Sequence, residues 1–154
     1  MIKTQQKFIG RWIAIGAIVS ALAVALGAFG AHGLESAIEG RVEDPVKNAA
    51  NWETGSRYLM YHGLGMILLG VTMNSKRTNR MLSVAGYLFV VGVILFSGSL
   101  FVLSLTDIKI LGAIVPLGGL AMIIGWACFA FGASTGNSIQ SPVEHDAQVG
   151  RTDV

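Results

Sequence analysis

Four long apolar stretches dominate the pattern of hydrophobic and polar positions along the chain. They cover approximately residues 12–31, 58–73, 82–105 and 108–131. A helix needs about 20 apolar residues to cross a hydrocarbon core of roughly 30 Å, where every backbone polar group must be satisfied within the protein. Because no stretch alternates with the period of two expected of a strand, we expect an all-α, integral membrane four-helix bundle.

The second stretch is short for a crossing, so its helix is expected to begin upstream. Asp44 is a suitable N-cap residue, and Pro45 fits the first helical position. Residues 45–56 mix apolar and polar side chains, which predicts a short helix lying along the interface within an outer loop. Gly55 and Ser56 are then expected to let the chain turn into the membrane.

Composition supports a lipid environment. Of 154 residues, 53% are hydrophobic and only 13% are charged, whereas a soluble domain carries roughly 25% charged residues. A net charge of +2 gives no footprint for nucleic acid. The single cysteine, Cys128, excludes an intrachain disulfide. A basic start before an apolar run also occurs in signal peptides, but a run of about 20 residues exceeds their usual length, and we favour a span.

The distribution of cations predicts the orientation of the bundle. Basic residues precede the first span and fill the connection between the second and third: Lys3, Lys7, Arg11, Lys76, Arg77 and Arg80. Because cytoplasmic segments are rich in Lys and Arg, both termini of residues 1–132 are expected on the cytoplasmic side of the inner (plasma) membrane. Residues 133–154 lose the apolar pattern and are expected to form a flexible cytoplasmic tail.

Small residues recur at helical spacing within the spans. Membrane helices pack through close backbone approach, which small side chains permit. The positions expected to pack in this way are Gly16, Ser20, Gly27, Gly30, Gly118, Gly125 and Gly132. We expect contacts within the bundle, with some small-residue surface left for a partner. Pro116 interrupts the hydrogen bonding of the last span and is expected to bend it.

Polar side chains gather at the expected outer side of the bundle. This candidate cluster comprises His32, Glu35, Glu53, Arg57, Tyr58 and His62. Glu53 and Arg57 stand four apart, the favourable order for an ion pair on a helix. An interfacial network that satisfies helix ends is the interpretation we favour. The open alternatives are histidine ligands for a metal or haem, and histidines that relay protons or sense external pH.

Recognisable catalytic arrangements are missing from the sequence. Ser97 and Ser99 have no histidine nearby in sequence, and no phosphate-binding glycine loop follows a strand. No aspartate, glutamate, lysine or arginine lies in 64–73 or 84–105, which argues against a proton pump. We therefore expect neither enzymatic activity nor a metal or cofactor.

Four motifs resemble a known family. They are "GAFGAHGL" at 27–34, "WETGSRYLMYHGLGM" at 52–66, "LFSGSLFVL" at 95–103 and "IVPLGGLAMIIGW" at 114–126. Together they resemble the small bacterial inner-membrane proteins of the YgdD and YwdK type, grouped as domain-of-unknown-function family 423. The resemblance covers approximately residues 10–132 and implies a four-span membrane protein. It implies no biochemical role.

We expect a protein that acts by contact in the lipid bilayer, as an accessory or assembly subunit or as a small homo-oligomer. The surplus of small residues and the lack of ionisable residues in mid-membrane motivate this hypothesis. One alternative is a small channel or carrier whose entry is lined by His32, Arg57 and His62. Another is a metal- or haem-binding membrane protein.

Overall fold

The chain folds into long helical rods. The computed structural model describes residues 2–75 and 80–135, and within these ranges it contains helices and no strands. The elements are α1 (Ile2–His32), α2 (Leu34–Ile38), α3 (Pro45–Ser75), α4 (Arg80–Val93), the π-helical turn η1 (Ile94–Gly98), α5 (Ser99–Thr106) and α6 (Leu111–Ser134). The all-α class is therefore confirmed.

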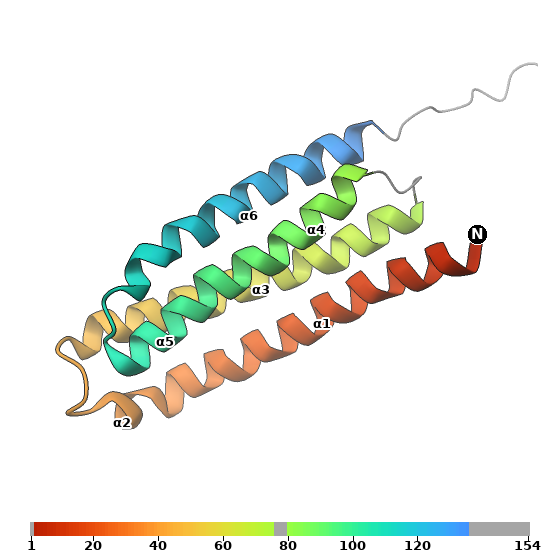
Figure 1. Ribbon diagram of the computed structural model, residues 1–154. Helices are drawn as coiled ribbons and strands as arrows, with labels where there is room; N and C mark the ends of the chain where they lie inside the picture. The colour runs from red at the N-terminus through yellow and green to blue at the C-terminus, as the bar shows by residue number, and fades with distance from the viewer. Residues whose placement is uncertain (1, 76–79, 136–154) are drawn as a thin grey trace, which may run out of the picture.

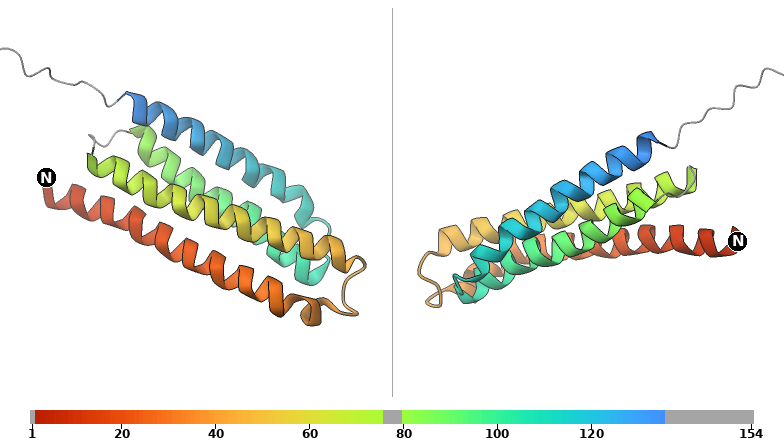
Figure 2. Two further views of the ribbon diagram at one scale, coloured as in Figure 1. Left: turned by 180° about the vertical axis from the view of Figure 1, so that it is seen from behind. Right: turned by 45° about the horizontal axis from the view of Figure 1, so that its top comes forward.

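The rods lie side by side along one common direction (Figures 1 and 2). The segments α4, η1 and α5 follow one another without a break and form one rod, so the bundle consists of α1, α3, this composite rod and α6. The start of α1 and the end of α6 lie at the same end of the bundle (Figure 1). Fully buried side chains such as Met66, Leu69, Leu82 and Phe89 fill the space between the rods.

Helix α3 is continuous from Pro45 to Ser75, so the expectation of a separate interfacial helix at 45–56 is wrong. Gly55 does not turn the chain; it is buried beside Phe101, whose ring would lie 2.9 Å from a Cβ at that position. The Ser56 hydroxyl donates to the carbonyl of Trp52 at 3.1 Å, which satisfies it within the helix. Tertiary packing thus overrides the weak helix propensity of these residues.

The start of α3 follows the expected capping chemistry. The backbone N–H of Lys47 donates to Asp44 Oδ1 at 3.0 Å, and Pro45 occupies the first helical position. Asp44 therefore satisfies one of the donors that every helix N-terminus leaves free. This local prediction is confirmed.

The last two rods differ in detail from the expected spans at 82–105 and 108–131. The third rod contains a π-helical turn at Ile94–Gly98, which the sequence pattern did not predict. The fourth helix begins at Leu111 because Asp107 adopts left-handed backbone angles, with φ 56°, and ends α5. Helix α6 then continues through Pro116 without interruption to Ser134.

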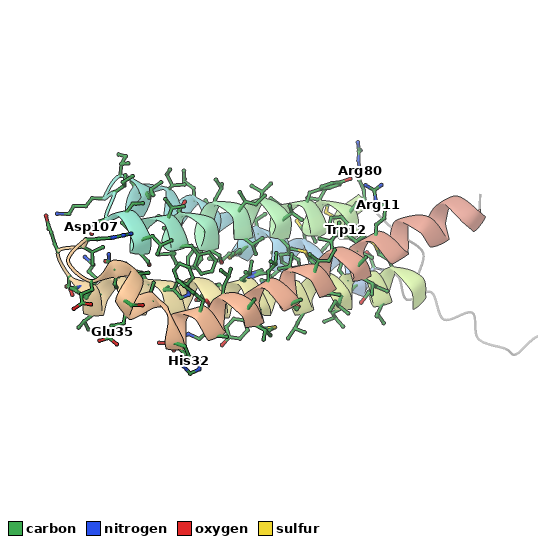
Figure 3. All side chains as sticks on the ribbon, turned by 90° about the horizontal axis from the view of Figure 1, so that it is seen from below. Arg11, Trp12, His32, Glu35, Arg80 and Asp107 are labelled. Atoms are coloured by element: carbon green, nitrogen blue, oxygen red, sulfur yellow. The ribbon has the colours of Figure 1, made fainter. Side chains whose placement is uncertain are left out.

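Three helical segments are long and apolar enough to cross a membrane, among the described residues. They are Gly10–His32, Arg80–Thr106 and Leu111–Ser134. Helix α3 has the length but is less apolar, since Lys47, Glu53 and Arg57 lie in its first half and Tyr58, Tyr61 and His62 begin its second half. Figure 3 places Arg11 and Arg80 toward one end of the bundle and Glu35 and Asp107 toward the other. The basic connection at 76–79 and the tail from 136 onward lie outside the described residues.

Small residues allow close approach at most of the expected positions. A Cβ built on Gly16 would lie 2.5 Å from the carbonyl oxygen of Gly63 in α3. A Cβ on Gly118 would lie 2.5 Å from the backbone nitrogen of Phe96, in the π-helical turn. Gly27 differs: nothing lies within 4 Å of the same construction, so the expected helix contact is not made there.

The remaining members of the expected packing set contact neighbouring rods in several ways. Gly30 lies under the indole of Trp52, Gly125 lies against Phe89, and Gly132 is buried. Ser20 lies against Gly63, where a Cβ would clash with the serine hydroxyl. Glycines therefore bring α1 against α3 and α6 against the composite rod.

Candidate functional site

The expected polar cluster does not form one site. His32 and Glu35 are exposed, and Figure 3 shows His32 pointing away from the bundle while Glu35 lies near its end. His62, in contrast, is only 3% exposed and lies between helices. An entry lined jointly by His32, Arg57 and His62 is therefore wrong, because burial removes His62 from the surface that exposes the other two.

His62 forms a hydrogen-bonded bridge between α3 and α6. Its Nδ1 lies 2.8 Å from the carbonyl oxygen of Tyr58, and its Nε2 lies 3.2 Å from Nε1 of Trp126. Because the indole nitrogen only donates, Nε2 accepts and Nδ1 donates, which fixes a neutral imidazole. The ring also meets Phe89 edge-on, with ring centroids 5.3 Å apart. Nε2 thus joins α3 to α6, while Nδ1 bonds to a carbonyl of its own helix.

Glu53 and Arg57 form the ion pair that their spacing predicts. Arg57 Nη2 lies 3.8 Å from Glu53 Oε1, and both side chains are more than half exposed. Exposed pairs of this kind contribute little to stability. Tyr58, the next residue, is partly exposed and packs against Phe96, with ring centroids 4.6 Å apart.

The motif "GAFGAHG" makes room for a tryptophan. Trp52 of α3 is buried, and its Nε1 donates to the carbonyl of Leu26 in α1 at 2.8 Å. A Cβ at Gly30 would lie 2.6 Å from the indole, so a larger residue there would push Trp52 away. Phe29 and Phe101 pack on the same indole, with centroids 5.2 and 4.7 Å away. Trp52 therefore holds the first half of α3 against the end of α1.

A cavity of about 580 Å³ with both polar and apolar lining residues lies at the same end, between α3, α5 and the start of α6. At its inner wall, Asn48 is buried and its Nδ2 donates to the carbonyl of Ser104 at 3.2 Å. At its rim, Lys109 Nζ lies 2.7 Å from Glu43 Oε2. The hydrogen bond to Glu43 and its negative charge raise the pKa of Lys109. This contact joins the loop before α3 to the turn before α6.

The metal and haem alternatives find little support in this geometry. No group of three or more His, Cys, Asp or Glu residues that could hold a metal ion occurs among the described residues. The ring nitrogens of His62 are already engaged by Tyr58 and Trp126. His32 belongs to the exposed end of α1 and lies apart from the buried His62.

Two residues that matter in the structure were missed by reasoning from the sequence. They are Trp126 and Asn48. Trp126 ends one of the four recognised motifs, so a search for donors near His62 within those motifs could have found it. The partner of Asn48 is 56 positions away in sequence, and no local pattern indicates such a contact. Ser97, considered from the sequence as a nucleophile without a nearby histidine, lies buried in the π-helical turn that packs against Gly118.

Comparison with known proteins identifies the family. Residues 26–119 match the family described as "Protein of unknown function (DUF423)". The UPF0382 membrane protein YwdK of Bacillus subtilis is 49% identical over 115 residues, which are 75% of this chain and 89% of the relative. The UPF0382 membrane protein SH2409 of Staphylococcus haemolyticus is 48% identical over 115 residues, 75% of this chain and 88% of the relative.

A third relative extends the match slightly. The UPF0382 membrane protein SSP2132 of Staphylococcus saprophyticus is 40% identical over 121 residues, covering 79% of this chain and 94% of the relative. Among solved structures, none matches the chain significantly. Because the family match covers more than half of the chain and the relatives are aligned over most of their length, the chain belongs to the DUF423 family, whose relatives here are named membrane proteins.

Proposed function

We propose that this protein is a four-span inner-membrane protein with both termini in the cytoplasm, which acts through helix–helix contact as a homo-oligomer or as an accessory subunit of a larger membrane complex. Each of its four rods is longer than 20 residues, the length that crosses a hydrocarbon core. In the second rod, the apolar half of α3 from Tyr58 to Ser75 lies beside the three apolar spans.

The observation that carries the contact role is a smooth outer face on α1. Five exposed alanines follow one another at intervals of three or four residues: Ala14, Ala17, Ala21, Ala25 and Ala28. At about 100° per residue they form one stripe, on a different side from Gly16 and Ser20, which face α3. Small side chains allow a second transmembrane helix to approach closely, whereas they offer lipid tails no particular advantage.

The same face extends to the end of the helix. His32 follows Ala28 by four residues and so lies on the alanine stripe, pointing away from the bundle (Figure 3). A polar side chain at the end of an apolar contact face can hydrogen-bond across the interface to a partner. This explains an exposed histidine at the membrane boundary without invoking a ligand.

Cysteine cross-linking tests the role of the alanine face. In a Cys128→Ala background, Ala21→Cys should form a disulfide-linked dimer in native membranes under mild oxidation. Leu22→Cys is the matched control, because the next residue on a helix points about 100° away and Leu22 is also exposed. Equal cross-linking at both positions would mean random collision rather than a defined interface.

Native mass spectrometry after mild extraction tests the assembly itself. We expect particles heavier than the 16.3 kDa chain, either multiples of it or a stoichiometric complex with another protein. Ala21→Phe should convert them to single chains, because a large ring prevents close approach of α1. A strictly monomeric wild-type particle without a co-purifying protein would refute the proposal.

A further inference from the structure

An apolar groove of about 680 Å³ lies between the last part of α1 and the first half of α3. Most of its lining is small or apolar: Ala23, Gly27 and Gly30 from α1, and Ala50, Trp52 and Met60 from α3. Its size is within the range of roughly 300–1,000 Å³ typical of small-molecule sites. Gly27 faces it with nothing within 4 Å of a built Cβ, so the groove is an open space between the helices.

One acid and one base line this groove. Arg57 and Glu53 both border it, one helical turn apart on α3. Their closest atoms are 3.8 Å apart, which is too long for a hydrogen bond. The guanidinium therefore keeps its N–H donors, and the carboxylate its acceptor oxygens, for another molecule that reaches the groove.

The two charges are ordered along the direction that crosses the membrane. Arg57 precedes the apolar half of α3, and Glu53 lies about 6 Å further from it along the helix axis. Tyr58 and Tyr61 follow at once and are 40% and 55% exposed. Exposed tyrosines at the end of an apolar segment are typical of the headgroup level of a bilayer. The guanidinium of Arg57 therefore lies deeper in the membrane than the carboxylate of Glu53.

From this arrangement we propose that the groove binds a phospholipid with an ethanolamine headgroup. The phosphate accepts hydrogen bonds from Arg57, the primary ammonium donates to Glu53, and the upper part of an acyl chain lies along Ala23 and Met60, the deepest residues of the lining. In such a lipid the phosphate lies at the glycerol side and the amine further out, which is the order of the two side chains. The proposal depends on the membrane crossing by α3 and is independent of the alanine face.

The carboxylate of Glu53 favours an ethanolamine headgroup over other common lipid headgroups. A purely anionic lipid would bring its phosphate to Arg57 but would supply no ammonium to Glu53, whose carboxylate lies 3.8 Å from the same guanidinium. A choline headgroup carries a cation without N–H donors, and the groove offers no cage of several aromatic rings around Glu53 among its lining residues. A primary ammonium satisfies the carboxylate directly.

Lipid binding can be measured on the purified full-length protein in mild detergent. Native mass spectrometry would count adducts as dioleoyl phosphatidylethanolamine, phosphatidylglycerol or phosphatidylcholine is added in separate titrations. We expect the ethanolamine lipid to bind most tightly, and Arg57→Gln or Glu53→Gln to weaken it by about threefold to tenfold. Glu35→Gln, at an exposed site outside the groove, should leave binding unchanged.

A groove-filling variant provides a test that does not alter charge. Gly27→Leu introduces a side chain into open space, so the fold is retained while the headgroup part of the groove is filled. Gly112→Leu is the matched control, since nothing lies within 4 Å there either and it does not line the groove. We expect adducts to fall by about tenfold only in Gly27→Leu.

Several results would overturn the proposal. Tighter binding of phosphatidylglycerol, or equal binding of phosphatidylcholine, would refute the ethanolamine assignment. Unchanged lipid adducts in Gly27→Leu would refute the groove as the site, and a change of oligomeric state in that variant would assign the groove to a second chain instead. Ala21→Phe separates this test from the contact role, because it should alter assembly and leave the adducts intact.

Discussion

The indole Nε1 of Trp126 donates a hydrogen bond to Nε2 of His62 across 3.2 Å and thereby joins α6 to α3. Trp126→Phe should destabilise the bundle because it leaves the buried acceptor without its donor. A double-mutant cycle that combines Trp126→Phe with His62→Ala should give an interaction energy of about 0.6 kcal/mol and no more than about 1.7 kcal/mol, as for hydrogen bonds between membrane helices. Unfolding in mixed detergent micelles measures it.

The matched control for this double-mutant cycle is Trp52, whose indole makes no hydrogen bond to His62. Trp52→Phe removes a donor to Leu26 and should destabilise the chain, yet its effect should add to that of His62→Ala, because the two groups share no hydrogen bond. Strict additivity of Trp126→Phe and His62→Ala would show that the bridge between α3 and α6 contributes no coupling energy.

Gly16 and Gly27 belong to the same stripe on α1 but should respond oppositely to alanine. In Gly16→Ala the new methyl group meets backbone atoms of Gly63 and Ile67 at 2.5 and 2.7 Å, which cannot move aside. The cost should be about 1–3 kcal/mol. Gly27→Ala meets open space and should stabilise the helix by up to about 1 kcal/mol.

The same unfolding assay compares the two glycine variants with the wild type. Circular dichroism before unfolding should show equal helix content, so that differences in midpoint reflect packing. If both variants destabilise the protein equally, the contact between α1 and α3 at Gly16 is looser than the structure has it. If neither does, helix–helix approach is not what fixes these rods.

Ser97 is 0% exposed, and its hydroxyl finds no hydrogen-bond partner among the described residues. Ser97→Ala removes this unsatisfied group from the π-helical turn and should stabilise the protein by about 1 kcal/mol. Ser104→Ala is the comparison, because the Ser104 hydroxyl donates to the Leu100 carbonyl at 2.8 Å. A loss of stability in Ser97→Ala would reveal a water or ligand bonded to that hydroxyl, since π-helical turns often mark functional sites.

Features that depend on local chemistry could be predicted from the sequence. The helical class follows from apolar stretches too long for strands, and the start of α3 follows from Asp44 and Pro45. The pairing of Glu53 with Arg57 follows from their spacing on one helix. In each case the interacting groups are neighbours in the chain.

Features that depend on packing between distant segments could not be predicted. Gly55 suggested a break in α3, but Phe101 packs against it and the helix continues. His62 was placed in a surface cluster, whereas Trp126, 64 positions away, holds it inside the bundle. Gly27 was expected to contact a helix because spacing shows which face a residue occupies but not where that face opens into a groove.

If α3 crosses the membrane, residues before it and residues after it must face opposite sides of the bilayer. In a Cys128→Ala background, Glu39→Cys should react with a membrane-impermeant maleimide in intact cells, and Arg80→Cys should react only after the membrane is permeabilised. The two exposed positions flank α3 alone, so they lie on opposite sides only if that helix spans the bilayer. Labelling of both in intact cells would place α3 on the surface, and labelling of Arg80→Cys alone would reverse the orientation. Because both residues are exposed and distant from the core, neither substitution should alter folding, and circular dichroism of the purified variants checks this.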